Sequence, residues 1–337
     1  MKFLSDIKAQ LFFTVMIFYL TQIESLESLH AFELPKLSID LRDYIELVRP
    51  YGWISNFVSI GFGLLLTNVW ILQGPSIILK YIIVGIAVGP LLWGGLYTFN
   101  SVLDAEYDRM VPIKMLRPIA SGRVSKQMGL IIGTIHVLLG LVLLALVSPV
   151  ILFLGFIMMG FQILYCFPPF RLKYTVVNLF FSGPMNHFFR ILIGWTLVLP
   201  ILEAPFLFLC GIVSILAIGY LSYKIQDKQI SSKLGYRGLE NYLSQRGVII
   251  FDCFLAIIAS LLIFIAFVTH QITWHLLFFI PLSFVVFLYI WISSSSSIWR
   301  AAKPGIFIGK LHNLLILFFI FEWLIIIIRL FPLFNIF

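Results

Sequence analysis

Nine long apolar segments constrain the fold of this chain more than any other feature of its sequence. A helix crosses the bilayer core with about 20 apolar residues, and such segments lie near residues 51–72, 76–99, 127–147, 149–167, 175–200, 204–223, 247–268, 272–292 and 311–332. Apolar residues make up 61% of the chain and charged residues 11%, against about 45–50% and 25% in soluble domains. The sequence therefore predicts an all-α integral membrane protein with about nine transmembrane helices, the third and fourth separated at Ser148-Pro149.

Lysine and arginine are distributed unevenly among the predicted loops. The loops after the second, fourth, sixth and eighth predicted helices are basic, whereas those after the first, third, fifth and seventh contain no Lys or Arg. Positive charge stays on the cytoplasmic side of a membrane. We therefore expect a cytoplasmic N-terminus and cytoplasmic basic loops, in a plasma membrane or an organelle inner membrane. Topology explains the net charge of +8, so no nucleic-acid partner is needed.

Residues 1–40 precede the predicted membrane domain, which covers 41–337. Leu11–Leu20 is a mainly apolar run of ten residues, which is too short to span a bilayer comfortably. No convincing signal-peptide cleavage site follows it. We interpret this part as an extension that forms a surface-lying amphipathic helix, with a signal-peptide core as the alternative.

A polar stripe ends the second predicted helix. Asn100, Asp104 and Asp108 are spaced four residues apart, so on a continuous helix each lies about 40° round and 6 Å along from the last. Two carboxylates and an amide oxygen suit Mg²⁺, which prefers oxygen ligands and also binds substrate phosphates. An ordinary solvated helix end is the alternative reading of the stripe alone.

A basic, turn-forming loop follows the stripe within 18 residues. Its cations are Lys114, Arg117, Arg123 and Lys126. A diphosphate is bound by metal ions on one side and by guanidinium or ammonium groups on the other. The order of stripe and loop therefore predicts a diphosphate site at the cytoplasmic face.

These motifs resemble the signature of the UbiA superfamily of intramembrane prenyltransferases. The resemblance is carried by Asn100-x-x-x-Asp104-x-x-x-Asp108, Arg117-Pro118-Ile-Ala-Ser-Gly122, Leu47-Val-Arg49-Pro50-Tyr-Gly-Trp53 and Tyr165-Cys-Phe-Pro-Pro169-Phe-Arg171-Leu-Lys173, and it spans roughly residues 41 to 332. It implies a helical bundle around a central cavity that opens to the cytoplasmic side. It also implies Mg²⁺-assisted ionisation of a prenyl diphosphate and capture of the carbocation by an aromatic, quinone-precursor or lipid acceptor in the membrane.

The resemblance and the polar residues inside the predicted helices define the expected site. Expected metal-binding and catalytic residues are Asn100, Asp104, Asp108 and Asp227. Expected substrate-binding residues are Arg49, Asn56, Lys114, Arg117, Arg123, Tyr165, Lys173 and Asn178. Arg190 lies deeper in the fifth predicted helix, where it either binds substrate or extends its guanidinium group outward to water.

The second acidic motif departs from the DxxxD pattern of the family. Asp227 aligns with the first acid, whereas Ser231 replaces the second, and a neutral hydroxyl is a poorer Mg²⁺ ligand than a carboxylate. Three alternatives to prenyl transfer therefore stay open. Arg237-Gly-Leu-Glu-Asn-Tyr242 resembles the branch that transfers phosphoribose to a polyprenyl phosphate, an inactive relative would also lose a carboxylate, and a transporter would share the helices.

Overall fold

The computed structural model describes residues 40–295, apart from 112–113, 182, 219, 221–237 and 239–241. Within these limits every regular element is helical, which confirms the predicted all-α class. The elements are α2 (Leu41–Val48), η1 (Pro50–Gly52), α3 (Trp53–Leu66), η2 (Trp70–Gln73), α4 (Ser76–Ile86), η3 (Ala87–Trp93), α5 (Gly94–Leu103), α6 (Ala105–Met110), α7 (Lys126–Val147), α8 (Pro149–Cys166), η4 (Leu172–Tyr174), α9 (Asn178–Phe181), α10 (Gly183–Thr196), η5 (Ile201–Glu203), α11 (Phe206–Ala217), α15 (Gln245–Val268), η6 (Trp274–Phe278) and α16 (Phe279–Ser295).

Four helical stretches in this part of the chain are long and apolar enough to cross a membrane. They are Ser76–Leu103, Lys126–Val147, Pro149–Cys166 and Arg246–Val268, and shorter apolar helices cover Trp53–Leu66, Phe206–Ala217 and Trp274–Leu288. The predicted helix at 311–332, the end of the helix at 204–223 and the extension at 1–39 lie outside the described residues. The number of nine helices therefore stays a prediction.

The predicted break between the third and fourth helices is present at Ser148. The Ser148 backbone is extended (φ −165°, ψ 139°), and α7 ends at Val147. Its hydroxyl accepts a hydrogen bond from the Val150 amide (3.2 Å), while Pro149 occupies the first turn of α8. A serine N-cap followed by proline, which needs no amide partner, is a favourable helix start.

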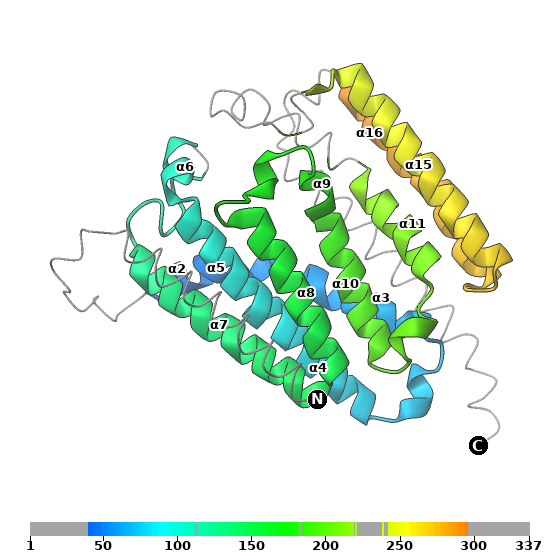
Figure 1. Ribbon diagram of the computed structural model, residues 1–337, viewed down its shortest axis with the longest axis horizontal. Coiled ribbons are helices and arrows are strands. Elements are labelled where there is room, and N and C mark those ends of the chain that lie inside the picture. The colour runs from blue at the N-terminus through cyan, green and yellow to red at the C-terminus, as the bar shows by residue number, and fades with distance from the viewer. Residues whose placement is uncertain are drawn as a thin grey trace. The chain divides into compact units, whose positions relative to one another are not determined.

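Several pairs of helices pack side by side. α3 packs against α10, α5 and η3 pack against α7, and α11 packs against α15 (Figure 1). The α3–α10 contact depends on glycine: a Cβ atom at Gly63 would lie 1.8 Å from the Ile191 carbonyl oxygen, and one at Gly194 would lie 1.8 Å from the Ile60 oxygen. Such small residues let helix backbones approach closely inside a membrane.

Candidate active site

The helix that carries the polar stripe is interrupted at Asp104, the middle residue of the stripe. α5 ends at Leu103, Asp104 leaves the helical region (φ −98°, ψ 5°), and α6 starts at Ala105. The stripe therefore lies on two helices, α5 and α6, and not on one continuous helix. The stripe nevertheless keeps its register, because the amides of Asp104 and Asp108 bond to the carbonyl oxygens of Asn100 and Asp104 (2.9 and 2.7 Å).

Oxygen atoms of the stripe converge on one ammonium group. Lys173 Nζ lies 2.6 Å from Asp104 Oδ2 and 3.1 Å from Asn100 Oδ1, and it also contacts Asp104 Oδ1. Tyr174 adds a hydroxyl donor to Asp104 Oδ1 at 3.3 Å. Both partners of the ion pair are buried, with Asp104 7% and Lys173 8% exposed. The Lys173 ammonium group therefore lies within hydrogen-bond distance of oxygen atoms from both Asn100 and Asp104. Oxygen atoms of these types are also the ligands that Mg²⁺ prefers.

The third member of the stripe faces a different cation. Arg117 Nη1 donates to Asp108 Oδ2 at 2.7 Å, and the Asp108 residue is 1% exposed. The loop that carries Arg117 is held near α6 by Arg109, whose Nε donates to the Ala120 carbonyl (3.0 Å). Its turn uses Gly122 with φ 80°, a conformation that favours glycine. The predicted pairing of stripe and basic loop thus rests on Asp108 and Arg117.

Cys166 and Gln162 belong to this site, and the sequence interpretation missed the role of the thiol. Cys166 Sγ donates to Asn100 Oδ1 (2.9 Å), and Gln162 Nε2 donates to Cys166 Sγ (3.1 Å). Cys166 is 1% exposed, as a small apolar core residue would also be. Its position next to Tyr165, inside the motif that resembles the family, is the signal that points to the site.

Arg49, at the end of α2, contacts α5, the helix that carries the first part of the stripe. Its guanidinium carbon is 5.2 Å from the centre of the Tyr97 ring, and its Nη2 donates to Ser101 Oγ at 3.0 Å. Arg49 also ends α2 in the left-handed conformation (φ 52°). The end of α2 therefore carries a cation to α5, one residue along from Asn100.

Tyr220, which was not predicted as a site residue, hydrogen-bonds both Tyr165 and Asn178. Tyr220 Oη donates to Asn178 Oδ1 at 3.2 Å, and the Tyr220 side chain also hydrogen-bonds Tyr165. Asn178 is buried, with 3% of its surface exposed. These side chains join α8, α9 and the chain just after α11.

Of three more predicted substrate-binding residues, Lys114 contacts Tyr107, the residue before Asp108, whereas the described partners of Asn56 and Arg123 lie away from the stripe. Lys114 Nζ lies 5.0 Å from the Tyr107 ring centre. Asn56 is fully buried in α3, where its Nδ2 donates to the Gly52 carbonyl (2.7 Å). Arg123 turns to α2, where it pairs with Asp43 and with Glu46 (2.6 Å).

The exposed Arg123 pair has a clear electrostatic effect. Hydrogen bonds from Arg123 first, and from Arg42 next, lower the pKa of the Glu46 carboxyl below its ordinary value. Because Arg123 forms ion pairs with the carboxylates of α2, the structure favours a role for this arginine in holding the basic loop against α2.

Asp227 and Ser231, the second acidic motif, lie outside the described residues. Within the described part of the chain, no group of three or more His, Cys, Asp or Glu side chains is arranged to hold a metal. A metal at the first motif would therefore rely on the amide oxygen of Asn100 together with the carboxylates of Asp104 and Asp108.

Arg190 does not extend to water, so that alternative of the sequence interpretation is wrong. The residue is 3% exposed, and its guanidinium carbon lies 4.5 Å from the centre of the Trp93 ring. The arginine is thus buried between α10 and η3.

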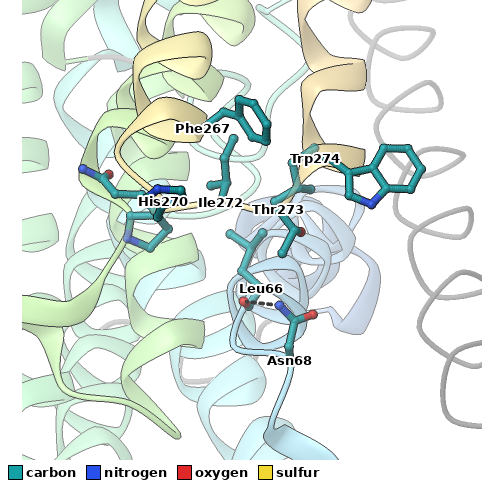
Figure 2. Close-up of a pocket in the computed structure, with 10 residues that line it drawn as sticks. Leu66, Asn68, Phe267, His270, Ile272, Thr273 and Trp274 are labelled. Atoms are coloured by element: carbon teal, nitrogen blue, oxygen red, sulfur yellow. Dashed lines mark hydrogen bonds between the residues drawn. The ribbon is translucent and has the colours of Figure 1, made fainter.

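A pocket of about 510 Å³ lies at the other end of α3, where this helix finishes at Leu66. Figure 2 shows its residues, which come from the ends of α3 and α15, from the segment before α11, and from η6 and the chain that leads to it. Asn68, His270, Gln271 and Thr273 supply its polar groups, and its lining contains no carboxylate, lysine or arginine. A site without fixed charge is a poor match for a diphosphate or its metal.

Fold and site together define a helical protein of membrane type in which a buried acidic helix end pairs with lysine and arginine side chains beside a basic loop. The model of the UbiA prenyltransferase family matches residues 56–321, and the chain belongs to this family. The predicted resemblance is therefore confirmed.

Two curated relatives match over short segments. Digeranylgeranylglyceryl phosphate synthase from Saccharolobus solfataricus is 33% identical over 87 residues, which are 26% of this chain and 28% of that protein. Decaprenyl-phosphate phosphoribosyltransferase from Mycobacterium tuberculosis is 27% identical over 126 residues, which are 36% of this chain and 41% of that protein. The matches thus span less than half the length of either relative.

Solved structures match over most of the chain. A UbiA homolog from Archaeoglobus fulgidus bound to GPP and Mg²⁺ aligns with a TM-score of 0.67 and 17% identity, covering 84% of this chain and 99% of that one. A structure from work on digeranylgeranylglyceryl phosphate synthase aligns with a TM-score of 0.64 and 21% identity, covering 84% and 98%. At these identities the likeness establishes the fold.

Proposed function

We propose that this protein transfers a prenyl group from a prenyl diphosphate to a small aromatic, quinone-precursor or lipid acceptor within the membrane, with Mg²⁺ as cofactor. The observation that carries the proposal is the convergence of Asn100 Oδ1 and both Asp104 oxygens on one cationic nitrogen. Hard oxygen ligands at a buried helix end fit Mg²⁺, which completes its shell with water and substrate phosphates.

The residues present fit the metal, and each has a definite role in the proposal. Asn100, Asp104 and Asp108 would hold Mg²⁺, with Asp227 helping from the second motif. Bound there, the metal supplies Lewis-acid assistance to the departure of pyrophosphate.

The protein's own cations act on the leaving group. Lys173 lies beside the stripe, so it is placed to exchange its contact with Asp104 for one with a phosphate oxygen. Arg117 uses one Nη for Asp108, and a guanidinium group has five N–H donors in all. Burial of both aspartates at 7% exposure or less lowers the local dielectric constant and strengthens these interactions.

Membrane orientation and the remaining helices belong to the same proposal. We place the stripe, the basic loop and the N-terminus on the cytoplasmic side, because the basic loops gather there. We also expect nine spans and a central cavity that opens on this side, with residues 1–40 as a surface-lying extension.

A second candidate function is phosphoribosyl transfer from phosphoribosyl diphosphate to a polyprenyl phosphate. Its support is the 27% identity over 126 residues with decaprenyl-phosphate phosphoribosyltransferase, together with Ser231 in the second motif. Both reactions release pyrophosphate, so the same acidic stripe serves either one.

The test is pyrophosphate release by the protein in nanodiscs that contain a native lipid extract. Geranylgeranyl diphosphate and phosphoribosyl diphosphate are offered separately, with and without Mg²⁺. We expect Mg²⁺-dependent release from the prenyl donor, and a loss of about 10²–10³-fold or more in an Asp104→Ala/Asp108→Ala variant. Release from the phosphoribosyl donor alone would establish the second function, and undiminished turnover by the double variant would refute the assignment of the stripe.

A further inference from the structure

Arg190 is a buried cation for which the structure provides no carboxylate. It lies in α10 with 3% of its surface exposed. Its Nε–H has no hydrogen-bond partner, and among the described residues no Asp or Glu forms an ion pair with it. Its described contact is the Trp93 ring, 4.5 Å from the guanidinium carbon.

This placement is unfavourable for stability. Removing a charge from water costs several kcal/mol after relaxation, and a cation–π contact returns about 2 kcal/mol when it is desolvated. A buried, unpaired polar group inside a membrane segment is therefore a candidate functional group. Since Nε–H is the donor of the guanidinium group that lacks a partner, a ligand oxygen would bind at the edge that carries it.

Two elements near Arg190 carry further buried polar atoms without partners: α3, which packs against α10, and η3, whose Trp93 contacts the guanidinium group. Asn56 Oδ1, Trp53 Nε1 and Trp93 Nε1 are buried and have no hydrogen-bond partner in the described structure. They come from α3 and η3, which pack against each other, and α3 packs along α10. Gly89 of η3 faces both α3 residues, since a Cβ atom there would lie 3.5 Å from Asn56 Cβ and 3.7 Å from Trp53 Cβ.

Together these groups offer N–H donors of Arg190, Trp53 and Trp93 and the acceptor oxygen of Asn56. Donors in excess and one full positive charge match an anionic oxygen group. The oxygen of Asn56 suits a neighbouring hydroxyl of the same ligand.

Aromatic rings connect this cluster to the acidic stripe. The Trp93 and Tyr97 rings pack edge to face with centres 5.8 Å apart. The Arg49 guanidinium group lies over the Tyr97 ring and donates a hydrogen bond to Ser101. Trp93 precedes Asn100 by about 10 Å along the helix, at 1.5 Å per residue. A small acceptor is long enough to span that distance, with its charged end at Arg190 and its reactive end toward the donor.

We propose that Arg190 determines acceptor specificity by binding an anionic oxygen group, a carboxylate or a phosphate, on the acceptor substrate. The inference rests on the proposed transferase function, which it deepens. The Nε–H and one Nη–H of the guanidinium edge form a two-pronged donor for two ligand oxygens, an arrangement that lysine cannot reproduce.

The test compares acids with their uncharged analogues on purified full-length protein in detergent. Dissociation constants are measured by calorimetry for 4-hydroxybenzoate against 4-hydroxybenzamide, and for a lysophosphatidic acid against the matching monoacylglycerol. We expect one of the acids to bind the wild type about 10-fold or more tightly than its neutral analogue. The pair that shows this preference tells a carboxylate acceptor from a phosphate acceptor.

In Arg190→Gln the preference falls to about one, while Lys80→Gln, which removes a cation from α4, keeps it. Retained preference in Arg190→Gln, or no preference for either acid in the wild type, would overturn the inference. Should Arg190→Gln fail to fold, Arg190→Lys replaces it, and the preference is again expected to fall several-fold; an unchanged preference there also overturns it.

Mg²⁺-dependent binding of geranylgeranyl diphosphate is measured on the same samples. We expect wild type and Arg190→Gln to bind this donor equally. If donor binding is intact and no acid preference exists, the Arg190 inference alone fails. If the wild type does not bind the donor with Mg²⁺, the proposed function fails.

Discussion

Lys173 and Arg190 are both buried cations, yet their surroundings differ. Lys173 lies at the helix end, where its charge is neutralised by Asp104 at 2.6 Å and where it also donates a hydrogen bond to the Asn100 oxygen. Arg190 in α10 rests on the Trp93 ring and has no carboxylate partner among the described residues. The charge of Lys173 is therefore neutralised within the protein, whereas the described residues supply no counter-ion for Arg190.

Lys173→Met gives the largest expected effect on stability. It leaves the buried Asp104 carboxylate without its cation, which costs about 3–5 kcal/mol, so we expect Tm to fall by about 10 °C in Mg²⁺-free buffer. Added Mg²⁺ should recover much of this loss, since it replaces the missing charge.

The matched control is Lys126→Met, because Lys126 also pairs with a carboxylate (Glu106, 2.7 Å) but with both side chains about half exposed or more. Exposed pairs contribute little, so Tm should barely change. Equal losses in both variants, or a loss in Lys173→Met that Mg²⁺ leaves unchanged, would contradict the view of Asp104 as a cation site.

Arg117→Gln gives the next largest effect. The Asp108 carboxylate loses a charged hydrogen bond, which is worth about 1.5–3 kcal/mol, and the donor loses a guanidinium contact. We expect a Kd for geranylgeranyl diphosphate in Mg²⁺ that is about 10-fold weaker. The comparison is Arg42→Gln, which removes a cation from an exposed ion pair with Glu46 within α2; a donor Kd affected as much by this change as by Arg117→Gln would remove Arg117 from the site.

Arg123→Gln tests the exposed clamp between the basic loop and α2, and its effect should be small. At pH 7 we expect Tm to fall by about 2 °C or less, because exposed ion pairs contribute little. The lowered pKa of Glu46 means that its contribution is present above the unfolded-state pKa and is lost as pH falls through the folded-state pKa. The difference in Tm between wild type and variant should therefore shrink at pH 4, and a difference that grows there would contradict the clamp.

Arg190→Met should cost no stability at all, which sharpens the contrast with Lys173. A lone buried charge replaced by an apolar side chain is often neutral or stabilising. We expect thermal unfolding in ligand-free buffer to give a Tm equal to that of the wild type, or higher. A fall as large as that of Lys173→Met would show that Arg190 has a structural partner and would end the comparison.

Helical periodicity explains why the stripe could be predicted from the sequence. Asn100, Asp104 and Asp108 share a face because backbone hydrogen bonds hold their spacing, even where the helix is interrupted at Asp104. Pro149 and Ser148 marked a helix boundary for a similarly local reason. Local rules of this kind need no knowledge of the rest of the chain.

Contacts between distant segments could not be predicted in the same way. The ion pair of Lys173 with Asp104 joins residues 69 positions apart, and it depends on how η4 lies against α5. The same holds for Arg123, whose charge suggested the diphosphate but whose partners lie on α2. The place of Cys166 beside Asn100, and of Tyr220 between Tyr165 and Asn178, also follows from packing that periodicity does not encode.

The most direct test of the acidic stripe is the equilibrium binding of geranylgeranyl diphosphate to wild type and Asp104→Asn, each with and without Mg²⁺. Asn keeps the shape of Asp104 and removes its charge. We expect Mg²⁺ to tighten donor binding at least about 10-fold in the wild type and in the neighbouring control Glu106→Gln, and to have no effect in Asp104→Asn. Tightening by Mg²⁺ that persists in Asp104→Asn would show that the metal binds elsewhere and would contradict the assignment of this site.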